Sequence, residues 1–263
     1  MVKVFSLNGT QGKEIALPKV FSVIVRNDLI KRAFLAERSN SRQAYGTNFL
    51  AGLRTSAHYH GVKDTRGSMK NREIARMPRS HNSSPQQEWR ARRVPQSVGG
   101  RRTHPPKAYK IWDQKINRKE AKLAMSCAIA ASAVLENVKN RGHIFDGELP
   151  IVFENDIQKI SKTKELKTIL KSVNLDKDLA RGEKKKVRAG RGKMRGRKYK
   201  RKKSVLFIVD GKQEMVKSVS NLQGCEICDV NTMKISLLAP GAVAGRLIVW
   251  SEGAINKLGE IYG

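Results

Sequence analysis

The sequence predicts an α/β fold: a Rossmann-like three-layer domain with a mostly parallel sheet, plus a long extended basic loop and a second basic loop. Two observations predict it. Short apolar runs of strand length alternate with amphipathic helical segments, the pattern of a parallel sheet covered by helices. The net charge of +30 on 263 residues is concentrated in segments 41–110 and 181–203, which lack that pattern. We therefore expect one α/β domain over residues 1–263 that carries two insertions.

The N-terminal elements are expected in this order. Val2–Ser6 alternates like a strand, and Phe21–Val25 is a second apolar run. Asn27 or Asp28 is placed to cap a helix. The apolar face of that helix comprises Leu29, Ile30, Ala33 and Phe34.

A second helix follows the first insertion. Asn117 and Glu120 resemble a capping box, which predicts a helix over Arg118–Lys139. Its apolar stripe consists of small residues, and such a stripe lets a helix lie close against a sheet. The stripe comprises Ala124, Cys127, Ala128 and Ala131.

The C-terminal half continues the alternation of strands and helices. The predicted elements are a strand Ile151–Phe153, a helix from about Thr163, a strand Val205–Val209, a short helix, a strand Glu226–Val230, a strand Leu247–Trp250 and a helical tail Glu252–Ile261. Right-handed crossovers between such strands give a sheet with helices on both faces. That fold alone does not define a function.

The charge distribution indicates a polyanionic partner. Ser41–Lys110 holds 15 Lys or Arg against three acids, and Arg181–Lys203 holds 14 against Glu183 alone. These segments carry +12 and +13, so the remaining chain has an ordinary balance of +5. Runs this dense repel themselves and build no core. A pI near 10.4 favours nucleic acid over a membrane surface as the partner.

Other classes of protein fit the sequence less well. No apolar stretch reaches the length of a transmembrane helix, and Met1–Gly9 lacks the layout of a signal peptide. Three cysteines, an odd number, suit a reducing cytoplasm better than a disulfide framework. We expect a cytoplasmic protein without a membrane partner.

The glycines Gly190, Gly192 and Gly196 do not form a cofactor motif. Their spacing is G-x-G-x-x-x-G, and they precede a strand-like run, whereas a dinucleotide fingerprint follows a strand and opens a helix. Arg197 and Lys198 follow Gly196, so the Gly-Lys-Ser/Thr of a P-loop is missing as well. We expect no cofactor and no small-molecule substrate. Glycine instead lets backbone amides approach phosphates closely.

The segment Ser41–Lys110 is too long and irregular for an ordinary loop. It contains five of the eight prolines and four of the five histidines, and no strand or helix period runs through it. Ordering its backbone costs on the order of 100 kcal/mol, which its few apolar side chains cannot offset. Contacts with a dense array of phosphate groups can offset that cost.

Catalytic and metal sites are not expected. His58 and His60 could bind a metal, but no cysteine or acidic cluster lies nearby in sequence, and imidazoles also contact RNA. Cys225 and Cys228 fall on a predicted strand, where they point to opposite faces, so we expect two buried cysteines. A nuclease would need clustered carboxylates for magnesium, and the acids of Ser41–Lys110 are scattered.

Four long motifs resemble a known family. They are "SRQAYGTNFLAGLRTSA" (Ser41–Ala57), "ARRVPQSVGGRRTHPPK" (Ala91–Lys107), "KVRAGRGKMRGRKYKRKKSVLFIV" (Lys186–Val209) and "DVNTMKISLLAPGAVAGRLIVWSE" (Asp229–Glu252). In this order they resemble the large-ribosomal-subunit protein four family in its archaeal form. The resemblance implies an α/β domain on the outer surface of the large subunit. It also implies a long loop that reaches through the rRNA to the nascent-peptide exit tunnel, and Lys186–Lys203 looks like the extra basic loop of the archaeal and eukaryotic branch.

The expected partners are therefore large-subunit rRNA, neighbouring large-subunit ribosomal proteins and the nascent peptide. The alternatives are a free nucleic-acid-binding protein, such as an RNA chaperone or a chromatin-associated protein, and an α/β enzyme that uses a nucleotide cofactor. Arginine dominates the long loop, which suits bidentate phosphate contacts and stacking on bases, and interleaved aromatic side chains can stack on bases. For Tyr45 and Phe49, packing at the root of the loop is an equal alternative.

All the predicted RNA-binding residues lie in the two basic segments, Ser41–Lys110 and Arg181–Lys203. They are Arg42, Tyr45, Arg54, His58, Tyr59, His60, Lys63, Arg66, Lys70, Arg72, Arg76, Arg79, Trp89, Arg90, Arg92, Arg93, Arg101, Arg102, His104, Lys107, Arg188, Arg191, Lys193, Arg195, Arg197, Lys198, Tyr199, Lys200 and Arg201. The midpoint of the long loop falls near Ala75–Met77, so the region from about Lys63 to Arg79 is expected at the tunnel. The expected tunnel-facing residues are Arg72, Ile74, Arg76 and Met77.

Overall fold

The structure of the chain is a computed structural model that describes residues 1–65, 68–81, 84–211 and 214–262. The chain forms two compact units: unit 1 comprises Met1–Ser41 and Asp113–Gly263, and unit 2 comprises Arg42–Trp112. All helices and strands of the described residues belong to unit 1. Unit 2 is thus inserted in the sequence of unit 1, and each is described separately below.

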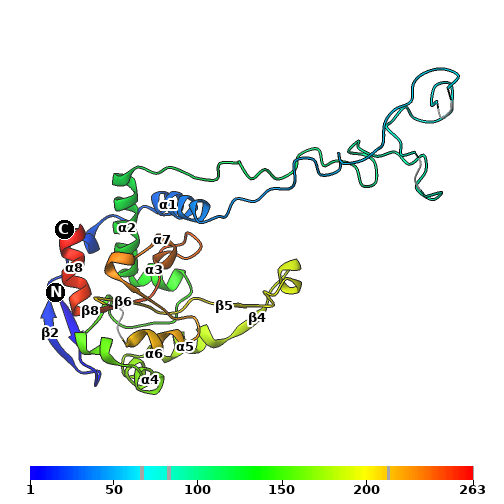
Figure 1. The fold of residues 1–263 in the computed structure, drawn as a ribbon. Coiled ribbons are helices and arrows are strands. Elements are labelled where there is room, and N and C mark those ends of the chain that lie inside the picture. Colours follow the sequence, from blue (N-terminus) through cyan, green and yellow to red (C-terminus); the bar gives the residue numbers. More distant parts are fainter. Residues whose placement is uncertain (66–67, 82–83, 212–213, 263) are drawn as a thin grey trace. The chain divides into compact units, whose positions relative to one another are not determined.

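The helices and several strands of unit 1 are labelled in Figure 1. Before the insertion come β1 (Val2–Phe5), β2 (Gln11–Ile15), the 3₁₀ turn η1 (Lys19–Ser22) and α1 (Asn27–Asn40). After it come α2 (Arg118–Ser132), α3 (Leu135–Asn140), β3 (Ile151–Phe153), η2 (Asn155–Lys159), α4 (Thr163–Ser172), α5 (Asp176–Glu183), β4 (Lys185–Val187), η3 (Arg191–Met194), β5 (Tyr199–Arg201), β6 (Leu206–Val209), α6 (Met215–Ser220), β7 (Glu226–Asp229), η4 (Val230–Thr232), α7 (Ile235–Leu238), β8 (Ile248–Ser251) and α8 (Glu252–Tyr262).

The central sheet is mixed and mostly parallel, which confirms the predicted α/β class. Its strand order is β2-β1-β3-β8-β6-β7. Only β1 and β2 pair antiparallel among the described strands of this sheet. One row of directly paired residues crosses five strands, and it consists of Val4, Val152, Trp250, Ile208 and Cys228.

Helices cover both faces of the sheet because its side chains alternate between two apolar clusters. Within β6, Leu206 and Ile208 belong to the first cluster, and Phe207 and Val209 belong to the second. The first cluster also contains buried residues of α1, α2, α7 and α8, and the second contains those of α3, α4, α5 and α6. Strands buried on both faces read as continuous apolar runs, which is why β3, β6 and β8 were predicted from the sequence.

The small residues of α2 pack as expected. Ala124, Cys127, Ala128 and Ala131 are at most 1% exposed, and the Cys127 thiol donates to the Ile24 carbonyl oxygen at 3.3 Å. The predicted helix Arg118–Lys139 is divided, however. It ends at Ser132, whose hydroxyl donates to the Ile129 carbonyl at 2.6 Å, and a hydroxyl bonded to its own helix in this way competes with the helical ladder.

Three predictions about individual elements were wrong in detail. The apolar run Phe21–Val25 forms no strand; its start lies in η1, and the second strand is the polar β2. The N-cap of α1 is Arg26 rather than Asn27 or Asp28, and the Arg26 guanidinium pairs with the Asp28 carboxylate at 2.7 Å. Asn117 is the N-cap of α2 as expected, but Glu120 accepts a hydrogen bond from Arg32 at 3.1 Å instead of closing a capping box.

The two ends of the insertion are tied together inside unit 1. The Asn40 side chain accepts a hydrogen bond from the Gln114 amide at 2.8 Å and donates to the Gln114 carbonyl at 3.3 Å. The last residue of α1 therefore lies beside the segment that leads into α2. This link sets the two ends of unit 2 next to each other on one domain.

Candidate nucleic-acid interface

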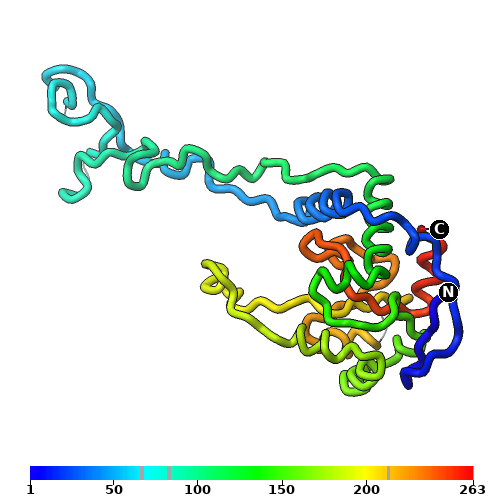
Figure 2. Tube along the Cα trace, turned by 180° about the vertical axis from the view of Figure 1, so that it is seen from behind, coloured from blue at the N-terminus to red at the C-terminus, as the bar shows by residue number. Residues whose placement is uncertain are grey.

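Unit 2 begins as two arms that lie side by side (Figure 2). The Thr47 amide donates to the Pro106 carbonyl oxygen at 3.1 Å. At Gly52, a Cβ atom would lie 2.6 Å from the Arg101 backbone, and φ is +76°. The arms can approach this closely only because glycine lacks a side chain and adopts positive φ at little cost.

The middle of the unit 2 sequence, which we call the distal loop and which is described at residues 57–65, 68–81 and 84–93, is held by a small network of backbone bridges. Arg79 pairs antiparallel with His58 on one side and with Ala91 on the other. The Arg79 guanidinium donates to the Trp89 and Ala75 carbonyl oxygens, both at 2.9 Å. This arginine, predicted to contact RNA, therefore shapes the loop from within.

Most of the predicted RNA-binding side chains are exposed. The half-buried ones are His60, Arg79, Trp89, Arg92 and Arg188, and Arg66 lies outside the described residues. Exposed side chains in unit 2 are Arg42, Tyr45, Arg54, His58, Tyr59, Lys63, Lys70, Arg72, Arg76, Arg90, Arg93, Arg101, Arg102, His104 and Lys107. In segment 181–203 they are Arg191, Lys193, Arg195, Arg197, Lys198, Tyr199, Lys200 and Arg201.

The half-buried side chains hold their own loops. Arg92 donates to the Val98 carbonyl at 3.0 Å, and Arg188 donates to the Arg197 carbonyl at 3.1 Å. Trp89 packs edge-on against His81, with ring centroids 5.0 Å apart. Trp89 thus packs within unit 2, and because its side chain is only half-buried, stacking on RNA stays a prediction.

The charges of unit 2 have little internal compensation. Among the residues that the structure describes in this unit, Lys63 and Asp64 form the only ion pair, 3.9 Å apart and well exposed. Exposed pairs of this kind contribute little to stability. The unit thus presents a large excess of positive charge that an external polyanion can neutralise.

Exposed aromatic side chains lie among these charges. Tyr45 is 58% exposed and Phe49 is 82% exposed, which favours stacking over packing at the root of the loop. Tyr109, which the sequence reasoning missed, is 71% exposed. Arg42 lies 3.6 Å from the centroid of the Trp112 ring. Such rings offer flat faces on which bases can stack.

The second basic segment forms an antiparallel hairpin where the sequence suggested a loop. In β4–β5, Lys185 lies opposite Arg201, and Lys186 lies opposite Lys200. Like charges directly across a strand pair destabilise it. The hairpin therefore gathers charge at a cost to the isolated protein, and phosphates placed along it would remove that cost.

A buried polar network anchors this hairpin to unit 1. Asp178 accepts hydrogen bonds from Arg181 at 2.7 Å and from the Ser204 hydroxyl at 2.6 Å, and its oxygens lie 3.1 Å from His143 Nδ1. Arg181 also donates to the Lys203 carbonyl at 2.7 Å. Asp178, His143 and Ser204 are almost completely buried, so both ends of the hairpin are fixed.

Burial and hydrogen bonding shift the pKa values of this network in defined directions. Burial opposes ionisation of Asp178, but hydrogen bonds from His143, Arg181 and Ser204 outweigh it and hold the pKa of Asp178 well below its usual range. Burial lowers the pKa of His143, and the bond to Asp178 offsets this only in part. The Leu247 amide donates to His143 Nε2 at 3.4 Å, which suits a neutral imidazole.

Both cysteines are buried as predicted, although only Cys228 lies on a strand, since β7 begins at Glu226. Cys225 and Cys228 are buried and free of disulfides, and they belong to the second and first apolar clusters respectively. The two side chains therefore point to opposite faces of the sheet. Burial raises the pKa of Cys225 to about 12, so its thiol is inert at neutral pH.

The histidines of the distal loop are arranged differently from expectation. His58 and His60 lie together with His81, which the sequence reasoning had not linked to them. No metal site was predicted, because His58 and His60 have no cysteine or acidic cluster near them in the sequence.

No described helix is long and apolar enough to cross a membrane.

The fold and these surfaces define a class: an α/β domain whose charge is concentrated on two structured basic segments suited to nucleic acid. Comparison with known proteins gives the family. Residues 15–261 match the ribosomal protein L4/L1 family, and the chain belongs to that family, which consists of ribosomal proteins rather than enzymes.

Three archaeal relatives show the extent of the similarity. A protein of Methanocaldococcus jannaschii is 45% identical over 259 residues, covering 98% of this chain and 97% of the relative. One of Methanococcoides burtonii is 44% identical over 256 residues, covering 97% and 96%. One of Archaeoglobus fulgidus is 43% identical over 263 residues, covering 98% of both. Each is named large ribosomal subunit protein uL4.

Proposed function

We propose that this chain is a structural constituent of the large ribosomal subunit, in the cytoplasm, and that unit 2 and the β4–β5 hairpin bind large-subunit rRNA. The observation that carries the proposal is the combination of family membership with exposed cations on two structured segments, most of which have no acidic partner among the described residues. The repulsion across Lys185–Arg201 and Lys186–Lys200 in the isolated hairpin supports it further. Phosphates are the anions that rRNA offers at high density.

Unit 1 acts as the scaffold in this proposal. We interpret it as a Rossmann-like three-layer domain, an interpretation supported by helices on both faces and by the parallel order β1-β3-β8-β6-β7. It holds the hairpin through Asp178 and Arg181, and it holds the ends of unit 2 through Asn40 and Gln114. Its remaining surface is available to neighbouring large-subunit proteins.

The far part of unit 2 would border the nascent-peptide exit tunnel. Within Lys63–Arg79, Arg72, Ile74 and Arg76 are exposed, and Met77 is half-buried. A tunnel wall with both basic and small apolar side chains makes no single contact strong enough to retain an emerging peptide. The free nucleic-acid-binding protein has no comparable support, because the relatives of nearly identical length are named as large-subunit proteins.

Site-specific crosslinking in translating ribosomes tests this function. Photo-reactive residues at Arg72 or Arg76 should capture nascent chains, and one at Arg197 should capture large-subunit rRNA. Lys162, an exposed residue of unit 1 paired with Glu165 at 3.2 Å, is the control and should capture neither the nascent chain nor tunnel rRNA. Probes at Arg72 and Arg76 that react only with rRNA would refute the tunnel assignment and leave the rRNA assignment to Arg197.

A further inference from the structure

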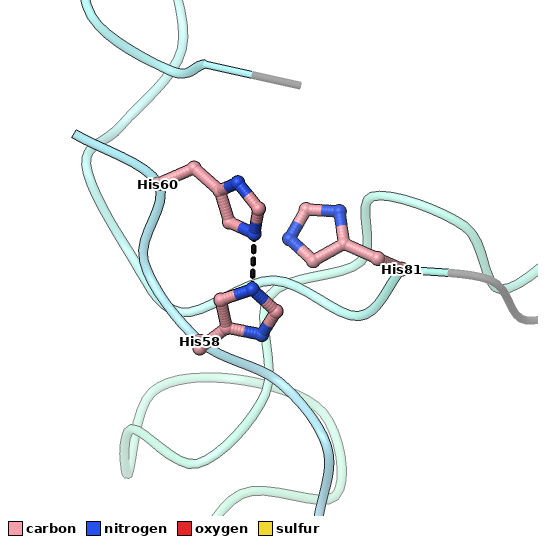
Figure 3. Close-up of side chains that lie close together, drawn as sticks. All are labelled: His58, His60 and His81. Carbon is pink, nitrogen blue, oxygen red and sulfur yellow. Dashed lines mark hydrogen bonds between the residues drawn. The ribbon is translucent and has the colours of Figure 1, made fainter. Parts of the chain in front are cut away.

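Three histidine side chains of unit 2 converge on one point (Figure 3). Their ligand nitrogens lie within 4.8 Å of one another, and the three ring centroids are 4.1, 4.4 and 4.8 Å apart. His58 and His60 come from one extended segment, where positions i and i+2 share a face. His81 comes from the facing segment, two residues beyond Arg79, whose backbone pairs with His58.

One hydrogen bond beside the cluster prepares a nitrogen of His58 to accept rather than donate. His58 Nδ1 lies 3.0 Å from the Ser56 carbonyl oxygen, so Nδ1 carries the proton and His58 Nε2 presents its lone pair. His58 Nε2 faces His60 Nε2. A backbone carbonyl that fixes the tautomer and the ring orientation in this way is the usual support of a metal-binding histidine.

His81 completes the arrangement. Its Nε2 is buried and has no hydrogen-bond partner among the described residues, and in Figure 3 it points toward the other two rings. A buried polar nitrogen without a partner is costly. Protonation alone does not satisfy all three nitrogens, because one proton shared by His58 Nε2 and His60 Nε2 leaves His81 Nε2 without a hydrogen-bond partner. One cation at the centre satisfies all three.

We propose that His58, His60 and His81 bind one divalent transition-metal ion, with Zn²⁺ as the ion of best fit. Neutral imidazoles are preferred ligands of Zn²⁺, and the nitrogens of a tetrahedral site lie about 3.3 Å apart when each is about 2.0–2.1 Å from the metal. Shifts on the order of 1 Å bring the three rings to that geometry. The fourth position is left to an oxygen ligand, since His58 is exposed and the other two are half-buried.

Such an ion would fasten the distal loop. Few apolar side chains are buried there, Ala57 and Met69 among them, and a core of this size does not stabilise a fold alone. The metal would link the segments that carry His60 and His81 at the point where the bridges of Arg79 and the Trp89–His81 contact meet. This inference does not rest on the proposed rRNA contacts, although it gives His58 and His60, which were predicted to contact RNA, a different role.

Metal titration of the untagged, chelator-treated full-length chain tests the proposal. Zn²⁺ binding is measured by competition with a chromophoric chelator, and Co²⁺ is used as a spectroscopic probe of tetrahedral nitrogen ligation. We expect one equivalent per chain for the wild type. His81→Ala should weaken binding by at least about 100-fold, since loss of a ligand exceeds loss of a supporting residue. His104→Ala, a histidine of the same unit outside the cluster, should bind as the wild type does.

A second readout separates a site from loose binding. Zn²⁺ should slow trypsin cleavage between Arg72 and Arg90 in the wild type and in His104→Ala, and it should have no effect in His81→Ala. No stoichiometric binding by the wild type overturns the proposal. Equal binding by the wild type and His81→Ala also overturns it and leaves His58 and His60 with their predicted RNA contacts alone.

Discussion

The β4–β5 hairpin gives the sharpest prediction about rRNA binding. Its two cross-strand pairs place four cations together, so we consider the variant in which Lys185, Lys186, Lys200 and Arg201 are all replaced by Gln. Each phosphate contact contributes about 0.7–0.9 to the slope of log affinity against log salt. Losing four contacts should make the slope shallower by about 3. Between 50 and 200 mM salt, the wild type should then lose about 60-fold more affinity than the variant.

Filter binding or fluorescence anisotropy on a large-subunit rRNA fragment measures this slope at several salt concentrations. A matched control replaces four exposed lysines of unit 1 by Gln, which changes the net charge equally; they are Lys162, Lys164, Lys171 and Lys177. The control should keep a slope close to that of the wild type. Equal slopes for the hairpin variant and the wild type would show that the hairpin is solvated rather than bound, and the reasoning would fail.

Three further predictions concern order, pH and the core. Trypsin should cut the RNA-free protein first within Arg42–Lys110 and Arg181–Lys203, and rRNA should protect both segments; resistance of the long segment without RNA would contradict the role given to phosphates. Because burial lowers the pKa of His143 from 6.5, the unfolded state takes up this proton first. The free energy of unfolding should then fall below about pH 6.5, by at most about 1.4 kcal/mol per pH unit, until the pH reaches the folded pKa. Urea unfolding between pH 5 and 7.5 checks this: His143→Gln should lose that part of the slope, whereas His104→Gln should retain it. Trp250 is fully buried and packs edge-on against Phe21 at 5.5 Å, so Trp250→Ala should cost about 3–5 kcal/mol in denaturant unfolding; a cost below about 1 kcal/mol would contradict its place in the core.

The sequence predicted the parts of the fold that bury apolar side chains. The strands β3, β6 and β8 and the helix α8 were predicted at nearly the observed bounds, and α1 and α4 at nearly their observed starts, because burial leaves a periodic or continuous apolar signal. β2 was missed because it is an edge strand whose side chains are mostly exposed. Such a strand is specified by backbone hydrogen bonds to β1, which leave no trace in hydrophobic periodicity.

Other omissions have similar causes. α5 carries mostly charged residues, and α7 has only four residues, so neither gives a clear helical period. The hairpin β4–β5 was missed because Lys and Arg dominate its strands, and its pairing depends on the fixed ends at Arg181 and Ser204. These elements form because of tertiary contacts, and the propensities of their own residues do not predict them.

For the candidate interface, composition located the two basic segments but not the role of each side chain. Arg79, Arg92 and Arg188 look identical to their neighbours in the sequence, yet each donates to backbone carbonyls inside its own loop. His81 was not linked to His58 because their proximity arises from the pairing of Arg79 with both His58 and Ala91. Backbone pairing between irregular segments that lie far apart in the sequence leaves no pattern that can be recognised in a single sequence.

The central claim is that the chain is a stably bound constituent of the large ribosomal subunit. Sedimentation of ribosomal subunits through a high-salt cushion, followed by quantification of this chain in each fraction, tests it most directly. The account predicts that the chain remains with the large subunit at one copy per particle, since many ordered contacts along unit 2 and the hairpin must break together. Release of the chain from the subunits at that salt, with recovery at the top of the cushion, would contradict it.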